Sequence, residues 1–301
     1  MENFAVTITF LFIGIALKHI PDFSVETGKI LNLFVIYISL PSLVLLKIPV
    51  LDFSSELLVP GLMPWVMLVF SATVILLLSL LLSWDRKTTG CLLLVIPLGN
   101  TSFLGVPMVK AFFGEQAVPY ALLYDQLGSF LALATYGSLI IAFYGTGEGR
   151  PSFRLICKKV ASFPPFIALI MALALKSISY PPPVINILTT LSSTLVPVVM
   201  IAVGFQLTLR LDRSLIFQIS IGLFIKLVAA PLMALFLCRI LGLEGEVVQV
   251  AIFEAGMPPM VSAGALAILA NLSPALTAAL VGIGIVFSFV TLPILHQLLV
   301  L

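Results

Sequence analysis

The chain has 301 residues, of which 61% are hydrophobic and only 9% are charged. Because soluble domains carry about 25% charged residues, this composition excludes a soluble globular domain and predicts an integral membrane protein. A net charge of +2 at neutral pH, without any run of basic residues, argues against binding to nucleic acid. The cysteines Cys91, Cys157 and Cys238 are isolated and lack metal-ligand spacing, so neither a metal nor a cofactor is expected.

Ten stretches are apolar and long enough to cross a bilayer, which requires about 20 residues, or about 17 at the short end. They cover residues 4–20, 29–47, 58–83, 88–113, 118–144, 160–177, 183–207, 214–240, 246–270 and 275–299. The first is predicted to be a span and not a signal peptide, because no basic residue precedes it and no small-residue cleavage site follows it. The longest connection, 145–159, is rich in glycine and charge and is expected to be a solvated linker.

The two halves of the chain resemble each other. Ala16–Ile20 matches Ala174–Ile178, and several further identities recur at a nearly constant spacing. Five spans in each half are an odd number, so the second copy enters the membrane from the opposite side. The sequence therefore predicts an all-α membrane fold of ten transmembrane helices, with a five-helix repeat over residues 1–150 and an inverted five-helix repeat over residues 151–301. Lysine and arginine are concentrated in the connections on one side, which places that side in the cytoplasm and both termini outside.

The fourth and ninth apolar stretches are interrupted. Ile96–Pro107 reads IPLGNTSFLGVP, and Pro97, Gly105 and Pro107 are predicted to break the helix there. Phe253–Met260 reads FEAGMPPM and is interrupted in the same way. An opened backbone at membrane depth is tolerated only when it is buried in protein or lines a wet cavity. Two broken spans in corresponding halves therefore indicate the binding site of a transporter, at the crossing of the two breaks.

Polar and small residues at the two breaks are the predicted substrate contacts. The helix half that resumes after a break offers unpaired N–H groups and a positive dipole end, which suit an anionic group. Glycine beside them lets a ligand approach the backbone closely. The alternative is a proline kink whose hydroxyl groups bond back to helix carbonyls. The predicted contacts are Gly99, Asn100, Thr101, Ser102, Gln126, Gly256, Pro258 and Pro259.

Three ionisable residues, Asp125, Lys226 and Glu254, fall inside predicted spans. A charge at mid-membrane costs about 2.5–3.5 kcal/mol on insertion scales, so such residues usually face the interior and pair. The two acids lie at similar depth, and we expect all three residues to form one cluster that carries the coupling ion. If Lys226 forms an ion pair with one acid, the other acid is left over and favours its protonated form, which makes it a candidate proton carrier. The excess negative charge could instead hold Na⁺, and Lys226 could face an anionic substrate.

The stretch from Gly99 to Pro107, GNTSFLGVP, resembles the fourth-helix motif of the auxin efflux carrier family, which includes bacterial malate and malonate permeases and is related to plant PIN carriers. Tyr124–Gln126 and the break between Glu254 and Pro259 also resemble the family pattern, and the likeness covers essentially the whole chain. It implies that the broken helices 4 and 9 cross. It also implies a scaffold of spans one, two, six and seven, through which two copies could form a homodimer. Spans three to five and eight to ten would form a transport domain that moves like an elevator.

The implied substrates are small organic anions, typically carboxylates such as malate, malonate or an auxin-like acid. Plant PIN carriers have a proline beside the crossover asparagine, where this chain has Gly99 and Thr101, so a bacterial dicarboxylate or an amino acid fits better than auxin. We expect a secondary active transporter in the bilayer of a cell membrane, most simply a bacterial inner membrane, coupled to H⁺ or the membrane potential. The chain has no nucleotide-binding loop and no metalloprotease or serine-hydrolase motif, so an enzyme is not expected. The alternatives are a sodium-coupled symporter of the bile-acid type and an amino-acid exporter.

Overall fold

The structure is a computed structural model that describes residues 2–51, 54–145, 153–208 and 212–300. This described part is almost entirely helical and contains no β-strand, only an isolated antiparallel bridge between Gly99 and Pro259. Six helical segments are long and apolar enough to cross a membrane: Thr27–Lys47, Ser55–Leu81, Glu115–Tyr144, Pro182–Gln206, Arg213–Ile240 and Pro274–Val300. Shorter apolar helices cover Phe4–Leu17, Thr101–Phe113 and Pro164–Ala174.

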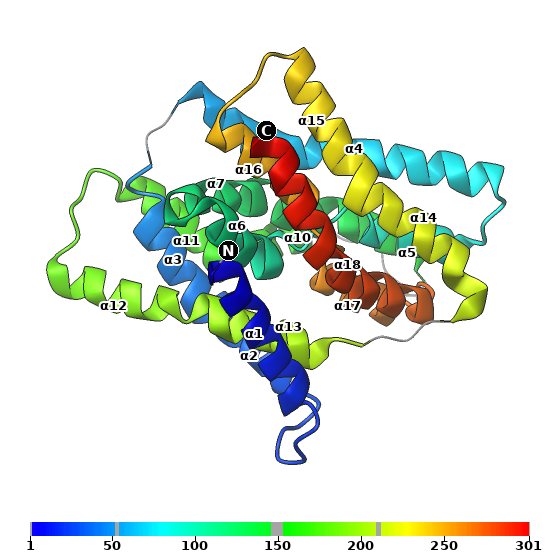
Figure 1. Cartoon of the computed structure of the whole chain (residues 1–301), viewed down its shortest axis with the longest axis horizontal. Helices are drawn as coiled ribbons and strands as arrows, with labels where there is room; N and C mark the ends of the chain where they lie inside the picture. Colours follow the sequence, from blue (N-terminus) through cyan, green and yellow to red (C-terminus); the bar gives the residue numbers. More distant parts are fainter. Residues whose placement is uncertain (1, 52–53, 146–152, 209–211, 301) are drawn as a thin grey trace. The chain divides into compact units, whose positions relative to one another are not determined.

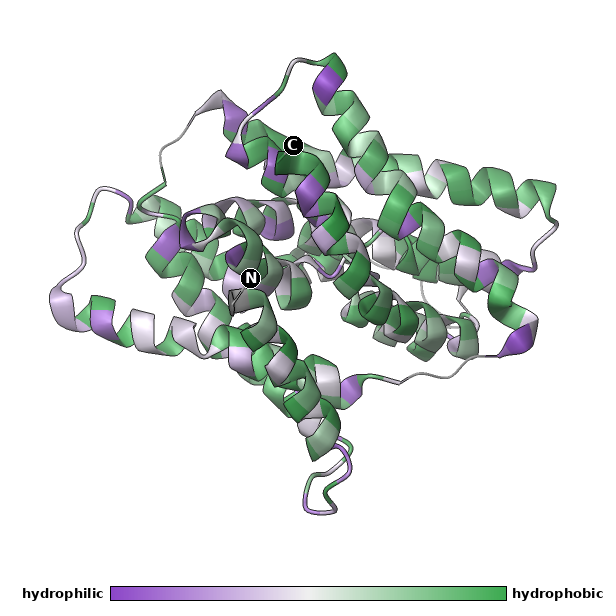
Figure 2. Cartoon of the chain, viewed as in Figure 1, coloured by the Kyte–Doolittle hydropathy of each residue, from purple (hydrophilic) through white to green (hydrophobic). Residues whose placement is uncertain are grey.

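Each of the ten predicted stretches is helical over most of its length, and hydrophobic residues cover most of these helices (Figure 2). The fourth and ninth stretches yield only short helices because both are interrupted. That all ten stretches cross the membrane, and that the two halves form an inverted repeat, stay predictions. The expected linker 145–159 is wrong in part, because α10 (Phe153–Ala161) is a helix. Its sequence combines apolar residues with Arg154 and Lys158, a composition typical of amphipathic helices.

The chain divides into two compact units, and each is discontinuous in sequence. The first comprises Met1–Ser55, Ser102–Leu122 and Lys158–Leu207, and the second comprises Glu56–Thr101, Leu123–Cys157 and Thr208–Leu301. The units therefore cut across the predicted repeats, whose boundary at 150/151 lies outside the described residues. The first unit contains spans one, two, six and seven together with Ser102–Leu122, and the second contains most of the others. The scaffold and transport roles stay predictions.

The first unit is built around the close crossing of its first and last helices (Figure 1). A Cβ atom at Gly14 would lie 2.1 Å from the carbonyl oxygen of Ile201, and one at Gly204 would lie 2.1 Å from that of Leu11. Only glycine lets the two backbones approach this closely. The helices of this unit are α1 (Glu2–Leu17), α2 (Thr27–Phe34), α3 (Leu40–Lys47), α6 (Val106–Phe113), α11 (Pro164–Ala174), α12 (Pro182–Ser193) and α13 (Leu195–Gln206).

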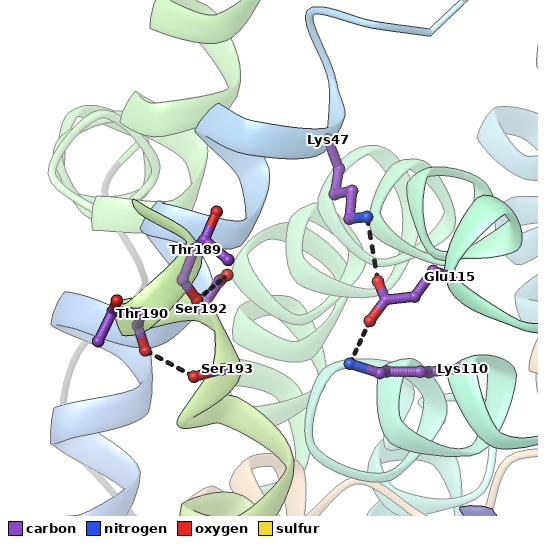
Figure 3. A network of polar contacts seen from close by, with 7 residues as sticks. All are labelled: Lys47, Lys110, Glu115, Thr189, Thr190, Ser192 and Ser193. Atoms are coloured by element: carbon purple, nitrogen blue, oxygen red, sulfur yellow. Dashed lines mark hydrogen bonds and ion pairs between the residues drawn. The ribbon is translucent and has the colours of Figure 1, made fainter. Parts of the chain in front are cut away.

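One acidic residue ties two helix ends of the first unit together. Glu115 lies between Lys47, at the end of α3, and Lys110, in the last turn of α6 (Figure 3). The distance from Lys47 Nζ to Glu115 Oε2 is 3.0 Å, and the other carboxylate oxygen pairs with Lys110. The Glu115 side chain is about half exposed (51%), so each pair adds little stability, about 0–1 kcal/mol.

The second unit is organised around α5 (Arg86–Val95), whose residues are buried from Thr88 onward. Asp85 caps this helix: its carboxylate accepts hydrogen bonds from the backbone N–H groups of Lys87 and Thr88 and from the Thr88 hydroxyl. The other helices assigned wholly to this unit are α4 (Leu58–Leu81), α8 (Phe130–Ala132), α9 (Ser138–Tyr144), α14 (Ile216–Phe224), α15 (Ala230–Ile240), α16 (Glu246–Ala255), α17 (Val261–Leu269) and α18 (Pro274–Val300).

Widened π-helical turns recur before prolines. The turns η1 (Val35–Ser39), η3 (Thr101–Gly105) and η8 (Ile225–Ala229) are followed by Pro41, Pro107 and Pro231, each in the first turn of the next α-helix. Proline has no N–H and clashes with the carbonyl four residues earlier, so a wider turn relieves the conflict without ending the helix. A fourth π-helical turn, η5 (Tyr124–Ser129), contains Asp125 and Gln126.

Candidate functional site

The first break is short and lies in the second unit. The helix α5 ends at Val95, and Ile96–Asn100 is not helical. Pro97 cannot donate to the carbonyl of Leu93, and the hydroxyl of Tyr136 donates to that oxygen instead, at 2.8 Å. Tyr136 therefore satisfies the acceptor that Pro97 leaves open.

Helical structure resumes at Thr101, which corrects part of the predicted break. Gly105 ends the π-helical turn η3, and Pro107 lies in the first turn of α6, so neither residue interrupts the helix. The proline is tolerated there because the wider π-helical turn η3 before it relieves the clash with the preceding carbonyl. Pro97 is thus the only one of the three predicted breakers that lies in the break.

The second break repeats the first. The helix α16 ends at Ala255, and α17 begins at Val261. Pro259 cannot donate to the carbonyl of Ala255, and Lys226 Nζ takes its place with a long hydrogen bond of 3.4 Å. A side chain from another helical segment, half-buried for Tyr136 and buried for Lys226, thus supplies the donor that proline lacks at both breaks.

The two breaks meet in an antiparallel pairing of main chain. The Asn100 N–H donates to the Pro258 carbonyl at 2.8 Å, and the Met260 N–H donates to the Leu98 carbonyl at 2.9 Å. These bonds flank the bridge between Gly99 and Pro259. The structure therefore confirms that the two interrupted segments meet.

Asp125 is tied to the first break by side-chain hydrogen bonds. The Thr101 hydroxyl donates to Asp125 Oδ1 at 2.6 Å, and Gln126 Nε2 donates to Asp125 Oδ2 at 2.7 Å. All three side chains are buried. The turn that carries Asp125 packs closely on α4, since a Cβ atom at Gly128 would lie 2.0 Å from Pro64 Cγ. The acid therefore has a fixed position and satisfied oxygens.

Glu254 is the contrasting acid. It is completely buried, and neither of its carboxylate oxygens has a hydrogen-bond partner among the described residues. The charges of Asp125 and Lys226 both act on it. Lys226, which is 3% exposed, bonds to the Ala255 carbonyl and not to Glu254. Lys226 and Glu254 thus line one cavity, and the hydrogen bond from Lys226 goes to a main-chain carbonyl. The role of the cluster in carrying a coupling ion stays a prediction.

A small cavity adjoins the crossing. The space open to the centre of a water molecule is about 10 Å³, enough for roughly one water. Its walls are Pro64, Leu68, Pro97, Leu98, Gly99, Tyr124, Ser129, Ala132, Lys226 and Glu254. Close to the crossing, Asn100 Nδ2 and Gln126 Oε1 are buried without a partner in the described chain. The site thus holds unused donors and acceptors but, in this conformation, no room for an organic solute.

The other predicted contacts lie in different surroundings. Ser102 is half-buried and belongs to the first unit. Gly256 packs closely against the side chain of Leu295, because a Cβ atom at Gly256 would lie 2.8 Å from Leu295 Cδ2. Pro259 packs on Gly284, where a Cβ atom would lie 2.7 Å from Pro259 Cδ. Sequence reasoning missed Tyr136 and Pro64, for which the only available signal was a polar or helix-breaking residue in an apolar span.

Comparison with known proteins identifies the chain's relatives. A family model described as membrane transport protein matches residues 1–296. The chain belongs to this family. It is 29% identical over 267 residues to an uncharacterized transporter of Methanocaldococcus jannaschii, which covers 86% of this chain and 85% of that protein. It is 27% identical over 296 residues to an uncharacterized transporter of Methanothermobacter thermautotrophicus, which covers 97% of this chain and 96% of that one.

Family membership confirms the likeness to the auxin efflux carrier family over the whole chain. The protein is a multi-pass membrane transporter and not an enzyme. The polar cluster at the crossing is accordingly considered below as a transport site.

Proposed function

We propose that the protein is a secondary active transporter of a small organic anion, with its substrate site at the crossing of the two broken helices. The observation that carries this proposal is the main-chain pairing of Asn100 with Pro258, which brings both breaks to one buried point. Unwound backbone inside a membrane protein is tolerated where it serves a ligand site, and half-helix ends there supply partial charges that bind ions and polar groups.

An anionic substrate is favoured by the donors at the crossing. Asn100 Nδ2 is buried without a partner in the described chain, and the Lys226 ammonium lies 3.1 Å from the position of a Cβ atom at Gly99. The helix α17 starts at Val261 without a side-chain cap, so its first N–H groups face the end of the break. A carboxylate is the simplest group that uses these donors, which supports malate, malonate or a related acid.

Coupling to protons is favoured over coupling to sodium. Asp125 and Glu254 outnumber Lys226, so one negative charge remains uncompensated if all three residues are ionised. A proton neutralises that charge without any further ligand, whereas Na⁺ would need several oxygen atoms arranged around it. The cavity of about 10 Å³ has room for little more than one water molecule. Opening of the site, expected as an elevator-like movement, is part of the proposal.

The test is transport by the purified protein in lipid vesicles. Carboxylates and amino acids are first screened for an increase in melting temperature, and labelled forms of those that bind are then offered to vesicles under pH, Na⁺ and voltage gradients. We expect accumulation of a carboxylate when the pH gradient supplies protons from the side of the substrate. Accumulation that needs a Na⁺ gradient and ignores the pH gradient would favour the bile-acid type of symporter.

A further inference from the structure

The two acids of the buried cluster have opposite environments, although the sequence gives them similar depth. Both oxygens of Asp125 accept hydrogen bonds, from Thr101 and Gln126, as an ionised carboxylate requires. Both oxygens of Glu254 lack partners within the described residues, and its exposed fraction is 0%. A buried carboxylate without donors is unfavourable, and such a group takes up a proton and becomes neutral. These surroundings favour the ionised form of Asp125 and the protonated form of Glu254.

Lys226 is short of partners in the same way. An ammonium group has three donors, and within the described residues Lys226 Nζ makes one hydrogen bond, the 3.4 Å bond to the Ala255 carbonyl. It lines the same water-sized cavity as Glu254. Its flexible stem of four carbons lets the ammonium change partners without movement of the backbone. A protonated Glu254 offers little attraction to it, whereas an ionised Glu254 would be its natural counter-charge.

Other titratable groups around Glu254 do not compete for this role. Among the helices packed closely on α16, α4 carries no titratable side chain, and α15 carries Cys238 and Arg239 next to the start of α16. His296 of α18 meets the ring of Phe253 edge-on, at 6.4 Å between centroids. Tyr124, Asp125 and Lys226, which all belong to π-helical turns, lie near enough to Glu254 to interact with it electrostatically.

We propose that Lys226 alternates between two partners, the Ala255 carbonyl and the Glu254 carboxylate, and that one proton on Glu254 decides between them. When Glu254 is protonated, Lys226 stays beside the main chain of Gly99 and Ala255, where it can bind an anion. When Glu254 releases its proton to the water in the cavity, Lys226 keeps its own proton and turns to the new carboxylate. With Glu254 ionised the cluster carries one net negative charge, and it carries the same charge when a monovalent anion and a proton bind together.

This inference rests on the proposed function for its link to transport. The change of partner by Lys226, called the switch below, can be tested without a substrate. Infrared difference spectra between acid and alkaline pH are recorded for the full chain in lipid vesicles. We expect the carbonyl band of a buried protonated carboxyl group in the wild type. The band should be lost in Glu254→Gln and kept in Asp125→Asn. Carboxyl-labelled glutamate should shift the band of the unmutated chain, which covers the case of a variant that does not fold.

The lysine is tested by the pH at which this band disappears. Lys226→Gln removes the partner of the ionised form, so the band should persist to a pH higher by about one unit or more. Lys110→Gln, a matched change of a lysine that is paired with Glu115, should leave the midpoint unchanged. A band that survives Glu254→Gln, or equal midpoints for the two lysine variants, would overturn the switch. Neither result depends on transport, so a failure to move any carboxylate would count against the proposed function alone.

Discussion

The backbone N–H of Asn100 donates to the carbonyl oxygen of Pro258 at 2.8 Å, across two interrupted helices that are far apart in the sequence. The bond uses main chain alone, so it leaves the side chain of Asn100 free for another task. Asn100 Nδ2 is indeed buried and has no partner in the described part of the chain. This division between a structural backbone and an unused side chain leads to the first prediction.

Asn100→Ala is expected to weaken binding of the carboxylate while the protein still folds. A hydrogen bond to a charged group contributes about 1.5–3 kcal/mol, so affinity should fall roughly 10- to 100-fold. The melting temperature without ligand should change little, because the backbone bond to Pro258 is retained. The measurement is the ligand-induced increase in melting temperature across a concentration series. Unchanged affinity would remove Asn100 from the site.

Tyr136→Phe is expected to destabilise the protein, because it leaves the Leu93 carbonyl without the donor that replaces Pro97. A buried acceptor without a partner costs about 1–3 kcal/mol. The control is the same change in a Pro97→Ala background, where the new N–H can bond to Leu93. There the loss should be smaller, and thermal unfolding of the four proteins gives the coupling. Equal losses in both backgrounds would show that Tyr136 does not compensate for Pro97.

Gly14→Ala is expected to lower the melting temperature, because the new Cβ atom would lie 2.1 Å from the backbone oxygen of Ile201. Overpacking of this kind typically costs about 1–3 kcal/mol. Gly61→Ala is the matched control in another helix, where the nearest atom, Leu127 Cδ1, would lie at an ordinary 3.8 Å. That change should be neutral or stabilising by up to about 1 kcal/mol, since glycine is a poor helix former. Equal effects of the two changes would contradict the close crossing of α1 and α13.

Asp85→Ala is expected to lower stability by about 1 kcal/mol near neutral pH through loss of the α5 cap. The hydrogen bond from the Thr88 hydroxyl, more than those from the backbone, holds the pKa of Asp85 below its usual value of 3.8. A lowered pKa stabilises the folded state above the usual value, and this stabilisation is lost as the pH falls through the folded value. The difference in melting temperature between wild type and variant should therefore shrink below about pH 4. A difference that does not shrink as the pH falls below about 4 would show that the charge of Asp85 does not matter.

The sequence indicated both breaks because proline and glycine act locally. It also indicated the polar cluster, because charged residues inside apolar spans must gather. It could not identify the side chains that donate to the carbonyls left open at the breaks, since Tyr136 and Lys226 reach Leu93 and Ala255 only through tertiary packing. It left open whether Lys226 faces an acid or a substrate, and it gave no signal for the Ala255 carbonyl to which Lys226 bonds.

Two boundaries were also missed for local reasons. Pro107 is a helix breaker by residue type, but the π-helical turn before it relieves the conflict, so the helix continues. The helix Phe153–Ala161 was hidden in a segment that charge and glycine marked as a linker. A short amphipathic helix gives a weaker pattern than a membrane span, since its apolar face is narrow.

The most direct measurement of the central claim is uptake of the bound carboxylate into vesicles under an imposed pH gradient, for the wild type and Glu254→Gln side by side. We predict that the wild type accumulates the carboxylate against its gradient when protons enter with it. Glu254→Gln should only equilibrate the carboxylate and should ignore the pH gradient. Proton-driven accumulation by Glu254→Gln, or accumulation by the wild type that follows Na⁺ and not pH, would contradict the account.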